Sequence, residues 1–494
     1  MNTLIKLAVN HDYAAEAANI IRLFYGKRKI NMIEYEALEN NQSFFQDDEI
    51  LLNSLLVNQG DTIVVKAIIH LHDGIKEYSE AYPKGTVKQE KEAVKLTMYK
   101  LLSEVHHKNY PWGILTGIRP IKIVHELMNQ GYSDDSIETY MINEHLVSTE
   151  KALLALEIAK RERSFIYPLD RNKVSVYIGI PFCPTRCHYC SFTSNSLKSC
   201  GGLVEDYLSA LLFEMEQTQV FMNKHQIKVQ TLYIGGGTPT SLNEVQLDRL
   251  LAKAWALFGD DLEEFTCEAG RPDTITESKL QVLKQRGVTR ISINPQTMND
   301  ETLEKIGRAH TSDETIKSFK LARRMGFDNI NMDIILGLPG EDTEHLERTL
   351  NAIEKLQPES LTVHTMAIKR ASIINENLDQ AFNQGKASDM MRLTSEYAKK
   401  QNLQPYYLYR QKNMVENLEN IGYCKPGYEC IYNIQIIEEK QTNIAFGADA
   451  ITKTVFTDEN RIERQGNIKD IKLYISRIDE QVNKKIKLLE ELYI

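Results

Sequence analysis

The sequence contains no uninterrupted apolar stretch of about 18 residues, the length that a membrane-spanning helix requires. It also lacks an excess of positive charge, since 59 Lys and Arg residues stand against 68 Asp and Glu residues, for a formal net charge of −9. A nonspecific nucleic-acid binder or a protein of anionic membranes needs a basic surface, so the charge argues against both classes. The N-terminal residues show no apolar segment with a small-residue cleavage site, and we expect a cytoplasmic protein.

Cysteine is scarce, but its distribution is uneven. Three of the seven cysteines, Cys183, Cys187 and Cys190, share one CxxxCxxC segment, so their thiolates can converge on one centre. Thiolate sulfur is the ligand that iron–sulfur clusters take, and three ligands on a cubane of four irons leave one iron open to a small molecule. The alternatives are a chance spacing and a zinc site, for which His188 is the nearest fourth ligand.

Between about residues 174 and 370, apolar strands alternate with helical segments. Strands and helices at this spacing predict a parallel sheet with right-handed crossovers. Eight such units would close a complete barrel, whereas six predict an open, partial (β/α)6 barrel with functional residues at the carboxyl ends of its strands. The predicted strands are Val174–Ile180, Thr231–Ile234, Glu264–Glu268, Arg290–Asn294, Asn331–Ile335 and Leu361–Met366, and the predicted helices are Leu203–Lys224, Glu244–Phe258, Glu277–Arg286, Asp300–Lys305, Ser312–Met325 and Asp342–Leu356.

A chain of this length is expected to form more than one domain. We predict an α/β protein in three parts: an N-terminal α+β accessory domain over residues 1–165, the barrel over residues 170–372, and a C-terminal α+β domain over residues 373–494 that covers the barrel. Smaller predictions are a β-hairpin over residues 62–74, strands at Leu403–Gln411 and Ile431–Glu438, and an amphipathic helix at Ile468–Leu492.

Several polar residues stand where the predicted barrel strands end. The segment Gly235-Gly-Gly-Thr238 follows the second strand, and its glycines let backbone N–H groups approach a ligand closely. Glu268 ends the third strand, where a carboxylate can accept hydrogen bonds from both hydroxyls of a ribose. Asp333 lies within an apolar strand and needs a partner, because burying a lone carboxylate is unfavourable. Arg308 is the predicted partner.

The segment from Tyr177 to Phe192, YIGIPFCPTRCHYCSF, taken with these strand-end residues, resembles the radical S-adenosylmethionine (SAM) superfamily. Within it, the chain is most similar to the oxygen-independent coproporphyrinogen III oxidase-like proteins of the HemZ type. The resemblance implies a 4Fe-4S cluster on the three cysteines, with the amino and carboxylate groups of SAM bound to the open iron. It implies SAM contacts from Tyr177, Tyr189, Gly236, Gly237, Thr238, Glu268, Gln296, Arg308, Asp333 and Ala367.

The resemblance also implies a reaction, the oxidative decarboxylation of coproporphyrinogen III to protoporphyrinogen IX. The implied partners are a tetrapyrrole substrate and a flavodoxin- or ferredoxin-type electron donor. Two departures leave alternatives open: Phe192 stands where the oxidases carry a fourth cysteine, and Gly179 stands where they carry a histidine. Related haem chaperones have a Phe at the first of these positions. The alternatives are therefore a haem-binding chaperone and an anaerobic haem-modifying methyltransferase of the same family.

Overall fold

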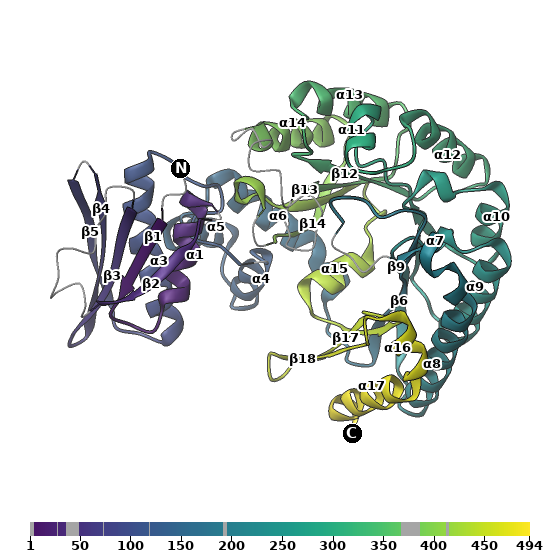
Figure 1. Cartoon of the computed structure of the whole chain (residues 1–494). Helices are drawn as coiled ribbons and strands as arrows, with labels where there is room; N and C mark the ends of the chain where they lie inside the picture. The colour runs from purple at the N-terminus through teal and green to yellow at the C-terminus, as the bar shows by residue number, and fades with distance from the viewer. Residues whose placement is uncertain are drawn as a thin grey trace. The chain divides into compact units, whose positions relative to one another are not determined.

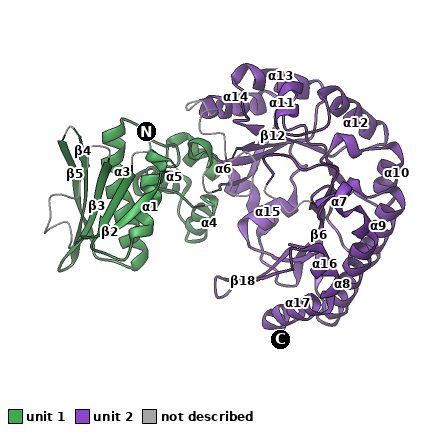
Figure 2. Cartoon of the chain, viewed as in Figure 1, with its two compact units in different colours: residues 1–156, 411–418 green, residues 157–410, 419–494 purple. Residues whose placement is uncertain are grey.

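The computed structural model describes residues 4–26, 28–35, 49–72, 74–117, 119–190, 195–366, 386–411 and 414–494 (Figure 1). The chain divides into two compact units, one of residues 1–156 with 411–418 and the other of residues 157–410 with 419–494 (Figure 2). Within the described ranges, every helix is too short or too polar to span a bilayer.

The first unit has the predicted α+β character. Its elements are β1 (Leu4–Val9), α1 (Ala14–Tyr25), β2 (Ile30–Glu34), β3 (Glu49–Gln59), β4 (Thr62–Leu71), β5 (Gly74–Pro83), α3 (Val87–His106), α4 (Ile121–Asn129) and α5 (Asp134–His145). The sheet has the order β2-β1-β3-β4-β5, and apolar residues of α1 and α3 join those of the strands in one core. The predicted hairpin is confirmed, because β4 pairs with β5 in antiparallel register. Asp73, predicted at its turn, lies outside the described residues.

The second unit contains the predicted partial barrel. All six predicted strands are present, and each pairs in parallel with the next. All six predicted helices are present too, and Figure 1 shows them around the outside of the sheet. The strands are β6 (Lys173–Ile180), β9 (Lys228–Gly236), β10 (Glu264–Glu268), β11 (Arg290–Ser292), β12 (Ile330–Leu336) and β13 (Ser360–Thr365), and the helices are α8 (Val204–Lys224), α9 (Glu244–Phe258), α10 (Glu277–Gln285), α11 (Asp300–Lys305), α12 (Ser312–Arg324) and α13 (Thr343–Glu354).

Side-chain caps mark the start of four barrel helices, α9, α10, α12 and α13. At α9, the side chain of Asn243 accepts from the backbone N–H of Gln246 at 2.9 Å, while the Gln246 side chain accepts from the backbone N–H of Asn243 at 3.0 Å. Thr311 and Glu314 form the same reciprocal cap at α12. Such caps satisfy N–H groups that the first turn of a helix leaves unpaired.

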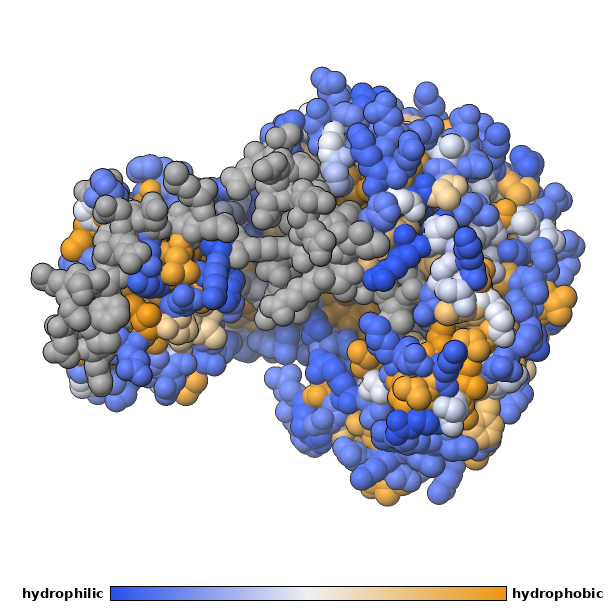
Figure 3. Space-filling view, in the orientation of Figure 1, coloured by the Kyte–Doolittle hydropathy of each residue, from blue (hydrophilic) through white to orange (hydrophobic). Residues whose placement is uncertain are grey.

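The outward faces of the helices in view are mostly hydrophilic in Figure 3.

The C-terminal part extends the barrel sheet at both edges. Next to β6, β16 (Thr442–Phe446) adds a further parallel strand, followed by β17 (Ile451–Phe456) and β18 (Arg461–Gly466). Next to β13, β15 (Asn420–Cys424) and β14 (Gln404–Tyr409) pair antiparallel, and α14 (Lys386–Lys400) precedes them. The barrel strands and these C-terminal strands therefore share one eleven-stranded sheet.

Two of the C-terminal predictions were wrong in detail. Ile431–Glu438 is the helix α15, not a strand. Its β-branched and aromatic residues favour a strand locally, but the helix lies inside the curve of the sheet and packs against β6, β9 and β14 (Figure 1). The predicted single helix over 468–492 is instead α16 (Ile471–Ser476) and α17 (Ile478–Tyr493), because Arg477 has a non-helical φ of −120°.

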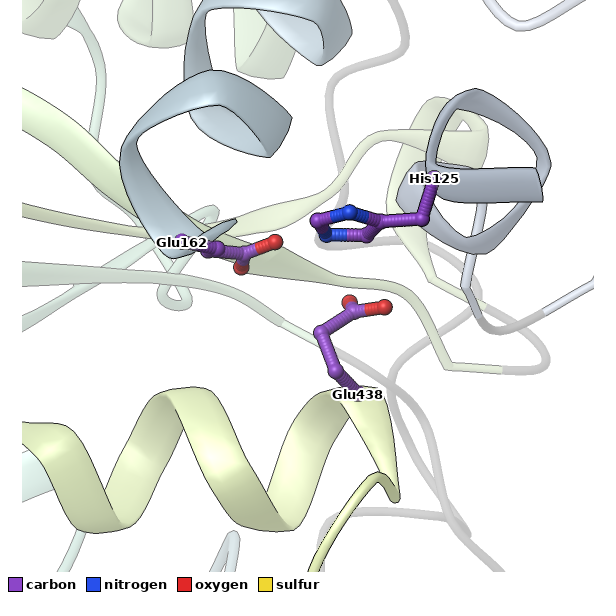
Figure 4. Close-up of side chains that lie close together, drawn as sticks. All are labelled: His125, Glu162 and Glu438. Atoms are coloured by element: carbon purple, nitrogen blue, oxygen red, sulfur yellow. The ribbon is translucent and has the colours of Figure 1, made fainter. Parts of the chain in front are cut away.

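Polar contacts at its two ends hold α15 within the second unit. At its start, the backbone N–H of Ile431 donates to the Glu264 carboxylate at 2.6 Å. At its end, the buried carboxyl groups of Glu438 and of Glu162, on α6 (Thr149–Ile166), approach within 4.8 Å (Figure 4). Burial, together with the charge of Glu438, raises the pKa of Glu162 well above its ordinary value. Both the burial and the neighbouring carboxyl group therefore disfavour the charged form of Glu162.

Candidate functional site

The three clustered cysteines follow β6 on a loop that begins with the short strand β7 (Phe182–Cys183). Cys183 and Cys187 are buried, and Cys190 is half-buried. The pKa of the Cys183 thiol is raised to about 11. Burial is the largest cause, and the charges of Cys190 and Cys187 also contribute to the rise. Three thiols near one another in a buried loop are the arrangement that a cluster needs, since the metal displaces their protons on binding.

The zinc alternative needs His188 as the fourth ligand. Its Nδ1 lies 3.0 Å from the Lys305 carbonyl oxygen, and its ring packs against Gly307. The His188 ring is therefore engaged by residues outside the cysteine loop, which weighs against its use as a zinc ligand.

The glycine-rich segment at the end of β9 lies directly against the cysteine loop. The N–H of Gly237 donates to the Ile180 carbonyl at 2.8 Å, and the N–H of Thr238 donates to the Phe182 carbonyl at 2.8 Å. The Thr238 hydroxyl is 3.4 Å from the Cys183 sulfur. A Cβ on residue 237 would lie 2.6 Å from the Phe182 carbonyl oxygen, so only glycine fits this approach. The structure thus brings together two motifs that are about 50 residues apart in sequence.

Glu268, at the end of β10, lies beside this segment. The Tyr233 hydroxyl donates to its Oε1 at 2.6 Å, and a Cβ on Gly235 would lie 2.9 Å from the same oxygen. Burial raises the pKa of the Glu268 carboxyl to about 7, and the nearby Asp333 adds to the rise. The group is therefore divided between its ionised and neutral forms at neutral pH.

A layer of tyrosines fills the barrel interior behind Glu268. Tyr177 on β6 and Tyr233 on β9 are register partners, and their ring centroids are 6.3 Å apart at an interplanar angle of 20°. Tyr432 of α15 stacks on Tyr233 with centroids 4.4 Å apart. Tyr177 also approaches the glycine segment, since its hydroxyl would lie 3.2 Å from a Cβ on Gly236. Through the Tyr233 hydroxyl, this layer of stacked rings fixes the position of the Glu268 carboxylate.

Arg308 joins the cysteine loop to the next two strand ends. Its Nη1 donates to the Tyr189 hydroxyl at 3.1 Å, and its Nη2 donates to the carbonyls of Gly270 at 2.8 Å and Asn294 at 2.7 Å. The structure corrects the predicted pairing of Arg308 with Asp333. Asp333 instead accepts from the Asn331 side chain on its own strand at 2.6 Å and lies 3.6 Å from Nε2 of His364 on β13.

Buried polar atoms without a partner gather at these strand ends. Asn294 Oδ1, Gln296 Oε1 and Arg308 Nε are buried and have no hydrogen-bond partner among the described residues. Gln296 also has a positive φ of 65°, which is uncommon for a residue other than glycine. Orphaned buried groups are unfavourable unless a ligand satisfies them. The two acceptors and one donor fit a polar ligand such as SAM, which carries hydroxyl, amino and carboxylate groups.

The structure brings together every described residue of the predicted site, although their roles as SAM contacts stay predictions. Ala367 lies outside the described residues. Sequence reasoning missed Asn294, Tyr233 and Tyr432. The first two had a signal: Asn294 precedes Gln296 by two positions, and Tyr233, like Tyr177, stands two residues before a glycine at a strand end. Tyr432 had none, because its segment was predicted as a strand.

Comparisons with known proteins support this description. A family model for the radical SAM superfamily matches residues 177–353. The oxygen-independent coproporphyrinogen-III oxidase-like protein HemZ of Bacillus subtilis is 42% identical over 452 residues, 89% of this chain and 90% of that protein. The heme chaperone HemW of the same organism is 40% identical over 201 residues, 40% of this chain and 52% of that protein.

The solved structure of coproporphyrinogen III oxidase HemN of Escherichia coli has a TM-score of 0.52 at 23% identity. The match covers 66% of this chain and 73% of that chain, which shows a shared fold. The similarity to HemZ extends over nearly the whole of both chains. The chain therefore belongs to the radical SAM superfamily, as a member of the HemZ-like group of oxygen-independent coproporphyrinogen-III oxidase-like proteins.

Proposed function

We propose that this chain holds a 4Fe-4S cluster on Cys183, Cys187 and Cys190, binds SAM beside it, and catalyses the oxygen-independent oxidative decarboxylation of coproporphyrinogen III. The observation that best supports this is the meeting of the cysteine loop with buried polar atoms that have no hydrogen-bond partner within the described part of the chain. The likeness to a protein named oxidase-like, over 90% of its length, supports the choice of substrate.

The cluster and SAM, when bound, supply a carbon-centred radical that can abstract hydrogen from a substrate. The chain supplies position and environment. Gly236 and Gly237 allow close approach of backbone to the methionine part of SAM, and the ionised Glu268 carboxylate accepts hydrogen bonds from its ribose. In the proposed reaction, each of two propionate groups gives a β-hydrogen atom to the radical, passes one electron to an external electron acceptor and releases CO2, which leaves a vinyl group. The protein therefore has to hold each β-carbon within reach of the radical.

The affinity for SAM is expected to rise with pH across neutrality. Because the pKa of Glu268 is about 7, its carboxyl is mostly neutral at pH 6 and mostly ionised at pH 8. If only the ionised form binds the ribose, the affinity is proportional to the ionised fraction, and the dissociation constant for SAM falls by up to about tenfold from pH 6 to pH 8. Anaerobic equilibrium dialysis with labelled SAM measures this dissociation constant.

Two variants separate Glu268 from other groups that titrate. Glu268→Gln is expected to bind SAM weakly and without this pH dependence. Glu264→Gln changes a buried carboxylate at the opposite end of the same strand. This variant is expected to keep the pH dependence of SAM binding. A Glu268→Gln protein with the full pH dependence of the wild type would assign the effect to a different group.

The deciding assay for the reaction supplies coproporphyrinogen III, SAM and dithionite without oxygen. We expect protoporphyrinogen IX together with 5′-deoxyadenosine. Formation of S-adenosylhomocysteine in place of 5′-deoxyadenosine would instead assign the chain to methyl transfer. The production of 5′-deoxyadenosine and of tetrapyrrole product are measured in the same reaction, by chromatography.

A haem-binding chaperone is the second candidate. It is favoured by the 40% identity to HemW over 201 residues and by Phe192 in place of a fourth cysteine. The same preparations decide between the candidates. Absence of protoporphyrinogen IX combined with tight, stoichiometric haem binding would favour the chaperone, whereas turnover without tight haem binding would favour the enzyme.

A further inference from the structure

One buried cation that is not among the predicted SAM contacts reaches the cysteine loop from the segment after β10. Arg271 follows β10 by three residues, and only 3% of it is exposed. Its Nη1 donates to the Thr185 hydroxyl at 3.0 Å and to the Thr185 carbonyl at 3.3 Å, and it donates to the Cys187 sulfur at 3.8 Å. Arg271 thus contacts the loop at one of the proposed cluster ligands.

Asp273 holds this guanidinium in place. Nε of Arg271 donates to Oδ1 of Asp273 at 2.9 Å, and Nη2 donates to Oδ2 at 2.7 Å, a two-point contact. The backbone between them is fixed as well, since the N–H and the hydroxyl of Thr274 both donate to the Arg271 carbonyl, at 3.0 and 2.7 Å. A planar guanidinium held at two points keeps its remaining N–H groups in one direction, here toward Thr185 and Cys187.

The two buried cluster cysteines therefore have donors of different charge. Cys183 lies 3.4 Å from the neutral Thr238 hydroxyl, whereas Cys187 faces a guanidinium. Hydrogen bonds to the sulfurs and nearby charge are among the properties that set the reduction potential of an iron–sulfur cluster. An added electron makes a cluster more negative, so a donor or a cation beside a ligand sulfur stabilises the reduced form.

We propose that Arg271 sets the reduction potential of the cluster through its hydrogen bond to the Cys187 sulfur, with Asp273 as the opposing charge. Arg271 raises the potential and Asp273 lowers it. The pair thereby tunes how readily the cluster accepts the electron that the proposed reaction requires. This inference rests on the cluster proposed above, but it does not depend on which tetrapyrrole is the substrate.

The proposal predicts opposite shifts from the two partners. Arg271→Met removes the donor and leaves the Asp273 carboxylate, so the potential is expected to fall. Asp273→Asn leaves the guanidinium uncompensated, so the potential is expected to rise. We expect each to change the one-electron equilibrium at least about tenfold, which corresponds to about 59 mV. Arg271→Lys keeps the charge and is expected to lie between Arg271→Met and the wild type.

The test uses the full chain, reconstituted anaerobically and titrated without SAM, with the reduced cluster followed by electron paramagnetic resonance. Iron content and circular dichroism are measured first. The matched control is Arg286→Met, because Arg286 makes the same two-point contact with Asp248, at 2.6 and 2.8 Å, between α10 and α9 rather than at the cysteine loop. The control is expected to leave the potential unchanged.

Because Arg271→Met removes the partner of the Asp273 carboxylate at the cysteine loop, that variant can lose its cluster through misfolding. The double variant R271M/D273N keeps the site neutral, and its potential is expected to fall less than that of Arg271→Met. Unchanged potentials in Asp273→Asn and the double variant, at wild-type iron content, would overturn the proposal, as would shifts of the same sign in both single variants. A wild-type chain that takes up no iron refutes the cluster itself, which the iron assay reports separately.

Discussion

Replacement of Cys183, Cys187 and Cys190 by alanine is expected to reduce the iron content of the anaerobically reconstituted protein from about four atoms per chain, the cubane stoichiometry, to none. The reason is geometric: two of these thiols are buried in one loop, and the third lies at its edge. The charge of each neighbouring cysteine contributes to the raised pKa of Cys183, so the three lie within electrostatic reach of one another. Iron analysis and the visible absorbance of the cluster measure the loss.

Cys200 supplies the control for this result. It follows the cluster by ten residues and is half-buried in α7 (Leu197–Cys200), where its sulfur is 3.6 Å from the Ser199 hydroxyl. Cys200→Ala is expected to keep its iron. The single variant Cys187→Ser is expected to abolish 5′-deoxyadenosine formation. If the triple alanine variant retained its iron and its absorbance, these three cysteines would not be the cluster ligands.

Gly237→Ala is expected to lower 5′-deoxyadenosine formation by more than about 100-fold, the order of loss that follows when a reacting group is displaced by about an ångström. The added Cβ would lie 2.6 Å from the Phe182 carbonyl, 2.9 Å from the Ile180 carbonyl and 3.0 Å from the Cys183 sulfur. Both carbonyls already accept hydrogen bonds from the glycine segment, so neither can move away without breaking them. The glycine segment and the cysteine loop must therefore separate.

Gly202→Ala is the matched control, because nothing lies within 4 Å of a Cβ at that position. Its 5′-deoxyadenosine formation is expected to stay within about twofold of the wild type, in line with surface substitutions away from special features. Thermal unfolding of both variants separates a local displacement from a loss of folding. Wild-type turnover by a folded Gly237→Ala protein would show that the glycine segment does not carry the proposed contact with SAM.

The barrel could be predicted from the sequence because its strands and helices are specified locally. Val174–Ile180 and the five later strands are short apolar runs, and four of the six barrel helices, α9, α10, α12 and α13, begin at Asn, Thr or Asp residues that cap them in the structure. Parallel order then follows from the alternation of strand and helix. Since the carboxyl ends of parallel strands lie at one edge of a sheet, the cysteines, Gly237 and Glu268 could be expected to meet there.

The sequence pattern led to a wrong prediction for α15. This helix lies inside the barrel and does not show the alternation of an apolar and a polar face by which a surface helix is recognised. The segment Ile431–Glu438 has the β-branched and aromatic composition of a strand, yet it forms α15 because it lies inside the barrel, capped by Glu264 from a strand about 170 residues earlier. Its Tyr432 completes the stack on Tyr233. No feature within the segment indicates either contact, because both depend on strands that are distant in sequence.

The sequence by itself determined the site's chemistry, since the cysteine spacing and the residue types at the strand ends are local features. Only the tertiary structure decided which polar group pairs with which. It directs Arg308 to Tyr189 and two carbonyls rather than to Asp333, and it directs Arg271 to Cys187. A long guanidinium side chain reaches several neighbouring strand ends, so its partner is chosen by the geometry of the curved sheet and by the burial that makes each unpaired atom unfavourable.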